Sequence, residues 1–119
     1  MNYQVCVIGA GTGGYVAAIR AAQLGAKVLL IEKKELGGVC LNRGCIPTKT
    51  LLKSAEKWQD ITHSEEFGMF VSEYAYDWDK IMERKNNVIY QLRSGIEKLI
   101  KSNKIELVEG SAHLIDAHS

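Results

Sequence analysis

The chain has 119 residues, of which 46% are hydrophobic and 24% charged, and its formal net charge is +1. This composition indicates one small globular domain or part of one, and excludes a disordered or fibrous chain. The small net charge argues against nucleic acid or an anionic membrane as the main partner, and no apolar run approaches the roughly 18 residues of a membrane span. We find no signal peptide and expect a cytoplasmic protein, in which a cysteine pair is more often redox-active or metal-binding than structural.

Two short apolar runs, residues 5–8 and 28–31, are typical of strands buried on both faces of a parallel sheet. Cys6 lies in the first run, and we expect it to be a small buried hydrophobic residue. Between the two strands the sequence predicts a helix that runs to about Leu24, with Gly25 as its C-terminal glycine.

The turn before this helix has the sequence GAGTGG and contains the pattern G-x-G-x-x-G. Gly9 permits a tight turn, Gly11 lets the backbone approach a pyrophosphate, and Gly14 allows close packing of helix and strand. The helix N-terminus favours the negative charge of the phosphates. Glu32, 18 residues after Gly14, ends the second strand and can accept hydrogen bonds from a ribose diol. Together these features predict a dinucleotide site, whereas the glycines alone could form a purely structural turn.

The residues do not decide which dinucleotide binds. Glu32 disfavours a 2′-phosphate through charge repulsion, but Lys33 and Lys34 offset that repulsion, so the charge pattern leaves both NAD and NADP open. The same unit serves NAD and FAD equally well.

The second motif is GGVCLNRGCIPTKTLL at residues 37–52, which places Cys40 and Cys45 five positions apart. On an ideal helix their Cα atoms would lie about 8.6 Å apart, beyond the roughly 4.4–6.8 Å of a disulfide. If the two cysteines bridge, the turn between them must be distorted, and Gly44 is suited to that. Pro47 then fits the first turn of a following helix. The alternatives are half of a metal site, which the spacing does not favour, or two unpaired thiols.

The two motifs at this separation resemble the N-terminal segment of the flavoprotein disulfide reductases. The resemblance extends to Gly110-Ser111-Ala112 and implies an α/β fold, namely part of an FAD-binding Rossmann-like domain with a parallel sheet and flanking helices. It also implies FAD bound by the glycine turn and a redox-active disulfide beside the isoalloxazine ring. The implied cofactor-binding residues are Gly9, Gly11, Thr12, Gly13, Gly14, Glu32, Lys33, Gly38, Val39, Cys40, Lys49 and Ala112. No metal ligand is implied.

The resemblance gives the two cysteines different roles. It implies that Cys40 is the interchange thiol that attacks the substrate, Cys45 the charge-transfer thiol nearer the flavin, and Lys49 the lysine near the flavin's reactive nitrogen. A helix N-terminus and a nearby cation would lower the pKa of a thiol at Cys45, and the charge of Lys49 would favour an anionic reduced flavin. Without the resemblance, Lys49 reads as a surface lysine.

The sequence Pro47-Thr48-Lys49 is nearer to the lipoamide type of this family than to glutathione reductases, in which a second lysine commonly follows the proline. The implied substrate is dihydrolipoamide, free or on the lipoyl domain of a 2-oxoacid dehydrogenase or glycine cleavage complex, oxidised through Cys40 and Cys45 with FAD and NAD⁺ in a homodimer. Mercuric or glutathione reductases and a nucleotide-binding module without turnover are the alternatives. Arg43 departs from the family, where valine is commoner, and it either faces solvent or tunes the thiols.

The remaining residues predict a longer helix through Leu51 and Trp58 to near Ile61, a loop over residues 62–76, a second helix and a third strand. The second helix is capped by Asp77 or Asp79, runs to about Ser102 and stops at Asn103; the strand is 105–109. The apolar stripe of that helix is expected to pack in the core or on a partner. It comprises Ile81, Val88, Leu92 and Leu99, widened by Met82, Ile89, Ile96 and Ile100.

Three strands are too few for a sheet covered on both faces. We therefore expect residues 1–119 to be the N-terminal portion of an FAD-binding domain, with the rest of that site, an NAD domain and an interface domain outside the chain, which by itself would be inactive. None of His63, His113 and His118 has the sequence context of the family's general base, so we assign them no catalytic role. His63 is expected on the surface.

Overall fold

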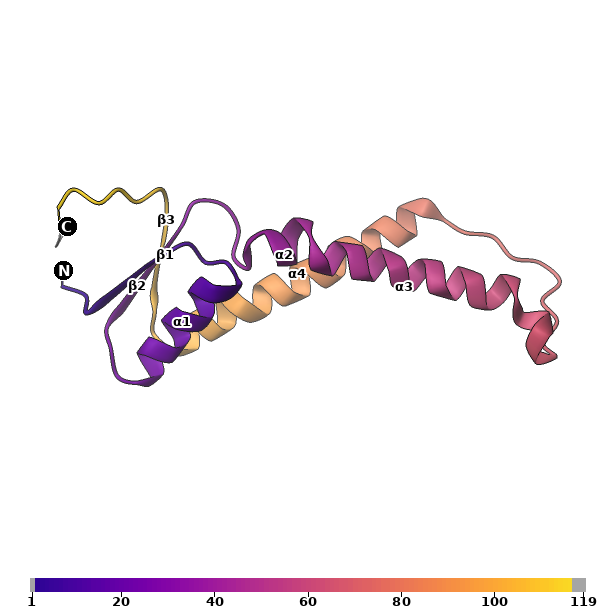
Figure 1. Cartoon of the computed structure of the whole chain (residues 1–119), viewed down its shortest axis with the longest axis horizontal. Helices are drawn as coiled ribbons and strands as arrows, with labels where there is room; N and C mark the ends of the chain where they lie inside the picture. The colour runs from indigo at the N-terminus through magenta and orange to yellow at the C-terminus, as the bar shows by residue number, and fades with distance from the viewer. Residues whose placement is uncertain (1, 117–119) are drawn as a thin grey trace.

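The computed structural model describes residues 2–116, so the assignment made for His118 lies outside the described residues. Its elements are β1 (Val5–Ile8), α1 (Thr12–Gln23), β2 (Val28–Glu32), α2 (Gly38–Arg43), α3 (Cys45–Thr62), a 3-10 helix η1 (Ser64–Phe67), α4 (Trp78–Ser102) and β3 (Glu106–Glu109). Figure 1 shows the sheet and α1 at one end, with α3 and α4 forming an arm that extends from them. The molecule measures 67 × 26 × 18 Å, and its radius of gyration is 20.5 Å. A compact chain of this length would have about 13.5 Å.

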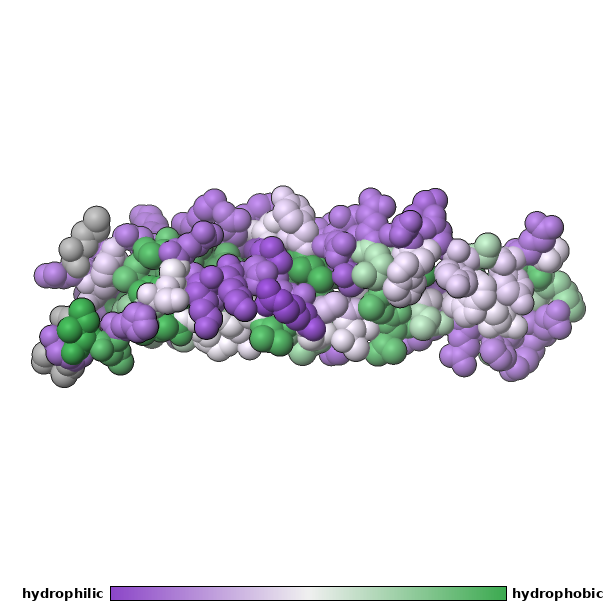
Figure 2. Space-filling view, turned by 90° about the horizontal axis from the view of Figure 1, so that it is seen from above, coloured by the Kyte–Doolittle hydropathy of each residue, from purple (hydrophilic) through white to green (hydrophobic). Residues whose placement is uncertain are grey.

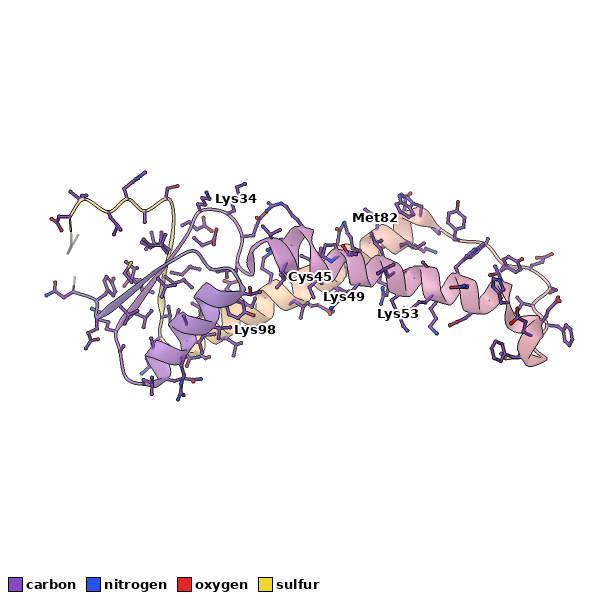
Figure 3. The ribbon with its side chains drawn as sticks, viewed as in Figure 1. Lys34, Cys45, Lys49, Lys53, Met82 and Lys98 are labelled. Atoms are coloured by element: carbon purple, nitrogen blue, oxygen red, sulfur yellow. A yellow bond between two sulfur atoms is a disulfide. The ribbon has the colours of Figure 1, made fainter. Side chains whose placement is uncertain are left out.

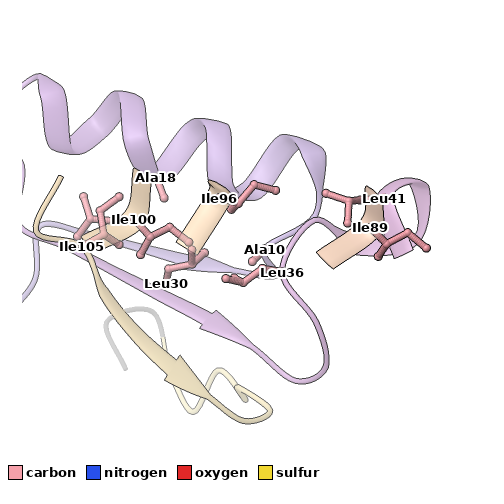
Figure 4. Packing of buried hydrophobic residues seen from close by; sticks show 10 residues of the cluster. Ala10, Ala18, Leu30, Leu36, Leu41, Ile89, Ile96, Ile100 and Ile105 are labelled. Carbon is pink, nitrogen blue, oxygen red and sulfur yellow. The ribbon is translucent and has the colours of Figure 1, made fainter. Parts of the chain in front are cut away.

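The three strands form one parallel sheet in the order β1-β2-β3. Val7, Leu30 and Leu107 are in register across it and belong to its inner face. Leu30 is fully buried there, and Ile100 of α4 and Ala18 of α1 are buried in the same cluster (Figure 4). The predicted α/β fold, a parallel sheet with flanking helices, is therefore confirmed.

The expectation that residues 5–8 form a strand buried on both faces is wrong, whereas no residue of β2 is exposed. Cys6 is exposed and Ile8 is 55% exposed, whereas Val5 and Val7 pack against the core. The cause is that the helices of the described chain pack on one face of the sheet, so alternate side chains of β1 point into the open. Figure 2 shows apolar patches over the sheet end and along the arm, interrupted by polar side chains.

Helix α1 ends at a Schellman motif, as its glycine predicted. Gly25 has φ +92°, and its N–H donates to the carbonyl oxygen of Ala22 at 3.0 Å. The N–H of Ala26 donates to the carbonyl oxygen of Ala21 at 3.1 Å. These two bonds satisfy carbonyl groups that the end of the helix would leave without partners, and they turn the chain into β2.

The limits of α4 agree with the sequence, but its buried stripe does not. The side chain of Asp77 accepts a hydrogen bond from the N–H of Lys80 at 3.1 Å, and Asn103 is the C-cap. The buried residues are Ile89, Ile96 and Ile100, whereas Leu92 and Leu99, which were placed at the centre of the stripe, are 43% and 49% exposed. The core thus lies on the flank of the predicted stripe: α4 packs against α1, α2, α3 and β3, and this packing buries Ile89, Ile96 and Ile100.

The segment predicted as a loop over residues 62–76 contains the 3-10 helix η1. It is one short turn that ends at Gly68, with φ +74°, and a turn of that length leaves no hydrophobic period in the sequence. The rest of the segment returns along α3, where Tyr74 and Tyr76 meet Trp58 edge to face, with ring centroids 5.3 and 5.4 Å away. His63 is exposed, as expected. Across the described residues, no helix has both the length and the apolar character that a membrane crossing requires.

The neighbouring glycines of α1 form a matched pair for testing the close packing of turn and helix. A Cβ atom at Gly14 would overlap the carbonyl oxygen of Gly9, so Gly14→Ala should lower the free energy of unfolding by roughly 3 kcal/mol. A Cβ atom at Gly13 would meet nothing within 4 Å, so Gly13→Ala should change it by at most about 1 kcal/mol, toward stabilisation. Urea denaturation followed by circular dichroism measures both, and equal destabilisation would contradict this packing.

Candidate functional site

Three separate segments meet at the carboxyl-terminal edge of the sheet. The N–H of Gly37 donates to the carbonyl oxygen of Ala10 at 2.8 Å, which ties the approach to α2 onto the glycine turn. The N–H of Gly110 donates to the carbonyl oxygen of Glu32 at 2.9 Å, which brings in the turn after β3. In parallel sheets this edge is where ligands commonly bind.

Two glycines make the tightest contact between these segments. A Cβ atom on Gly38 would lie 2.8 Å from the Cα atom of Gly11, and Gly38 has φ +66°, a conformation that favours glycine. Gly37 precedes it with φ +94°, and a Cβ atom there would lie 2.7 Å from the Leu41 side chain. The glycine turn and the N-terminus of α2 can therefore touch backbone to backbone.

Glu32 ends β2 beside the glycine turn. Its Oε2 accepts a hydrogen bond from the N–H of Ala10 at 2.7 Å, and its Oε1 accepts one from the N–H of Lys34 at 2.9 Å. Desolvation alone would raise the pKa of Glu32, but the backbone N–H groups of Ala10, Lys34 and Lys33 and the charge of Lys33 outweigh it, so the pKa lies below its ordinary value. The carboxylate is ionised and keeps lone pairs for further donors such as hydroxyl groups.

Cys40 and Cys45 form a disulfide, with their Cα atoms 4.7 Å apart. Cys40 lies in the first turn of α2, and Cys45 is the first residue of α3. Gly44 separates the two helices with φ −124° and ψ −103°, which breaks the helical path and shortens the distance expected on an ideal helix. The predicted distortion at Gly44 is confirmed, and Pro47 lies in the first turn of α3 as expected. The two sulfurs are thus bonded to each other.

Cys45 and Lys49 lie on successive turns of α3, as Figure 3 shows. The sulfur of Cys45 is therefore at the N-terminus of an 18-residue helix. The positive end of such a helix and a lysine one turn away both favour a thiolate over a thiol once the disulfide is reduced. The role of Cys45 as the charge-transfer thiol stays a prediction.

Arg43 faces the surface and not the sulfurs. Its Nη2 donates to both carboxylate oxygens of Glu35 at 2.8 Å, and the two side chains are 52% and 33% exposed. A pair of this exposure stabilises a protein by at most about 1 kcal/mol. Of the two roles that the sequence left open, the structure shows the solvent-facing one.

The structure brings some of the predicted cofactor residues together and leaves others at the periphery. Gly9, Gly11, Gly14, Glu32 and Gly38 surround the edge of the sheet through the contacts above. The others lie in the first turns of α1 and α2, in the second turn of α3 or after the strand ends. Their contact with a cofactor stays a prediction: Thr12, Gly13, Lys33, Val39, Cys40, Lys49 and Ala112.

Sequence reasoning missed the residues that brace the cysteine segment. The side-chain Oδ1 of Asn42 accepts hydrogen bonds from Arg93 of α4, and the side-chain Nη1 of Arg84 donates to the carbonyl oxygen of Thr50 at 3.2 Å. The position of Asn42 between the two cysteines could have pointed to a structural role for its amide. No local pattern could have pointed to an arginine 51 residues away.

Comparison with known proteins gives a consistent result. The model of the family described as pyridine nucleotide-disulphide oxidoreductase matches residues 3–119. The chain is 49% identical over 116 residues to a dihydrolipoyl dehydrogenase of Geobacillus stearothermophilus, covering 98% of this chain and 25% of that protein. It is 48% identical over 118 residues to a dihydrolipoyl dehydrogenase of Acholeplasma laidlawii, covering 98% of this chain and 35% of that protein.

A solved structure is similar over nearly the whole chain. It is the Cu(II) complex of the HOCl-induced flavoprotein disulfide reductase RclA from Escherichia coli, with a TM-score of 0.78, 32% sequence identity, and coverage of 98% of this chain and 23% of that one. The chain thus spans between about a quarter and a third of the length of these relatives.

The lowered pKa of Glu32 predicts a pH-dependent contribution to stability. The unfolded carboxyl titrates at its ordinary value of 4.5, so the contribution is present above that pH and is lost as the pH falls through the lower folded pKa. At pH 7, Glu32→Gln should lower the free energy of unfolding by about 1 kcal/mol, because two charge-assisted hydrogen bonds are weakened. The difference from the unmodified chain should shrink as the pH falls below the ordinary value of 4.5.

Urea titrations across this pH range measure the effect, and Glu83→Gln on the exposed side of α4 controls for the loss of one carboxylate. A Glu32→Gln difference that stays constant with pH would contradict the assignment.

Proposed function

Because the chain belongs to the pyridine nucleotide-disulphide oxidoreductase family, we propose that it is the N-terminal portion of the FAD-binding domain of a dihydrolipoyl dehydrogenase. The observation that carries the proposal is the Cys40–Cys45 disulfide at the start of α3, held to the glycine turn by the contact of Gly11 and Gly38. The complete reaction requires the longer protein, since the relatives are three to four times the length of this chain.

The residues at the sheet edge fit FAD. The N-cap residue of α1 is Gly11, which has no side chain to cap the helix. The backbone N–H groups of the first turn are therefore available for a pyrophosphate. Cβ atoms at Gly9 and Gly13 would meet nothing within 4 Å, which leaves open space over the turn. The ionised Glu32 would bind the adenosine ribose, and Lys49 would lie near the reactive end of the flavin. When bound, FAD supplies the acceptor for the electron pair of the cysteines, and NAD⁺ is the proposed final acceptor.

The cysteines would oxidise a dithiol in two exchange steps. A substrate thiolate attacks the Sγ atom of Cys40, the bond between the two protein sulfurs breaks, and Cys45 leaves as a thiolate stabilised by the α3 N-terminus. The second substrate thiol then attacks the first substrate sulfur, which is bonded to Cys40 in the mixed disulfide. This step releases the cyclic disulfide product and the Cys40 thiol. Two electrons and two protons leave the substrate in total: the electrons reside on the protein cysteines, one proton is on the Cys40 thiol, and the other was released to solvent when the attacking thiolate formed.

We propose dihydrolipoamide, free or on the lipoyl domain of a 2-oxoacid dehydrogenase or glycine cleavage complex, as that dithiol. Identities of 48% and 49% to dihydrolipoyl dehydrogenases support it over other reductases of the family. The proposed setting is a cytoplasmic homodimer.

A chimera tests the function directly. This chain would replace the matching N-terminal quarter of the Geobacillus stearothermophilus dihydrolipoyl dehydrogenase, with which it shares 49% identity. The chimera should be yellow and reduce NAD⁺ with dihydrolipoamide, and Cys40→Ser should abolish that activity because the mixed disulfide cannot form. A chimera that binds FAD but oxidises no dihydrolipoamide, while reducing glutathione disulfide, would point to another reductase class.

The same chimera separates the roles of the two cysteines. After reduction, Cys40→Ser should retain a long-wavelength absorbance band from the Cys45 thiolate against the flavin, and Cys45→Ser should lack it. Absorbance spectra under anaerobic reduction record the band. Its survival in Cys45→Ser and loss in Cys40→Ser would reverse the two roles.

A further inference from the structure

Asn42 stands between the two cysteines in α2, and its amide is held on both sides. Nδ2 donates to the carbonyl oxygens of Leu36 at 2.9 Å and Gly38 at 2.8 Å. Oδ1 accepts from Nε of Arg93 at 3.1 Å and from Nη2 of Arg93 at 2.6 Å. Both donor hydrogens and both acceptor positions of the amide are therefore used.

Arg93 determines the orientation of that amide. A guanidinium group is only a donor, so the oxygen of Asn42 must face α4 and the NH₂ group must face the backbone that enters α2. The two carbonyl groups that it binds flank Gly37, and they belong to the stretch that contacts the glycine turn. The hydrogen bonds thus run from α4, through Asn42, to the first turn of the helix that carries Cys40.

We propose that Arg93 is a positioning residue for the Cys40–Cys45 pair. Acting through Asn42, it holds the first turn of α2 against α4, so that the two sulfurs stay within bonding range across the break at Gly44. Without it, α2 gains freedom in the reduced state, the effective concentration of one thiol at the other falls, and the disulfide becomes easier to reduce. The inference rests on the proposed function for its biological meaning, but its test needs no flavin.

Arg84 supplies a matched control on the same helix. Its Nη1 donates to the carbonyl oxygen of Thr50 at 3.2 Å, so it also joins α4 to the cysteine-bearing segment. The hydrogen bond is made to Thr50, which lies more than one turn beyond Cys45 in α3. Cys45, the first residue of that helix, is not held by Arg84. Loss of Arg84 should therefore weaken the packing of the two helices without changing the geometry of the sulfurs.

The measurement is the equilibrium of the 119-residue chain with dithiothreitol. One dithiothreitol, by losing two electrons and two protons, becomes a cyclic disulfide, while the Cys40–Cys45 bond breaks and both cysteines become thiols. Alkylation of the thiols followed by mass spectrometry gives the oxidised fraction. Cys6→Ser in every variant removes the third thiol.

Arg93→Ala should lower the constant for disulfide formation about tenfold, equal to about 30 mV for this two-electron couple. Arg93→Lys should restore part of the loss, since one ammonium can still donate to Oδ1 of Asn42. Arg84→Ala should leave the constant within about twofold of the reference, even where it lowers the melting temperature. Circular dichroism confirms that each variant is folded at the temperature used.

A double-mutant cycle tests the path through Asn42. If Arg93 acts through that amide, Asn42→Ala and the double variant Asn42→Ala with Arg93→Ala should have the same constant, so the two changes do not add. Additive effects, an unchanged constant in Arg93→Ala, or an equal shift in Arg84→Ala would each overturn the proposal. If a variant of the 119-residue chain is unfolded, the same substitution is made in the chimera. The reduction potential of the cysteine pair is then measured there and tests the proposal in the same way. That readout is distinct from failure to oxidise dihydrolipoamide.

Discussion

The contact between Gly11 and Gly38 is the constraint on which the site depends. It joins two backbones with no side chain between them, because a Cβ atom on Gly38 would come within 2.8 Å of the Gly11 Cα atom. One backbone begins α1, whose N-terminal N–H groups are the proposed phosphate site, and the other begins the helix that carries Cys40. The glycine turn and the cysteine pair are in this way brought to the same edge of the sheet by the shape of the main chain.

Charge at this edge follows from the same arrangement. Backbone N–H groups near the glycine turn hold Glu32 ionised, and the start of α3 presents its positive end at Cys45. The two effects concern different groups, a carboxylate and a sulfur, and neither needs a buried ion pair. Arg43, the most obvious cation in the cysteine motif, contributes to neither, since it is paired with Glu35 at the surface.

The features that the sequence predicted are those set by neighbouring residues. The glycine turn, the Gly25 and Asp77 caps and the break at Gly44 each follow from the backbone needs of a few consecutive positions. Burial was harder, because an apolar strand such as 5–8 does not reveal whether both of its faces are covered, and Cys6 proved exposed. The prediction that Leu92 and Leu99 are buried was wrong for a related reason. A broad apolar face of a helix does not show which of its flanks contacts the core. The bond between Arg93 and Asn42 depends on how distant helices pack, which no local pattern encodes.

The length of α4 has a mechanical consequence. As one continuous helix of 25 residues, about 37 Å long, it has Ile96 and Ile100 in the core under the sheet and its arginines on α2 and α3. The helix is unbroken from Trp78 to Ser102, so the core residues and the two arginines belong to one element. A change in side-chain volume at Ile100 therefore acts on the same helix that binds Asn42 through Arg93, about two helical turns away.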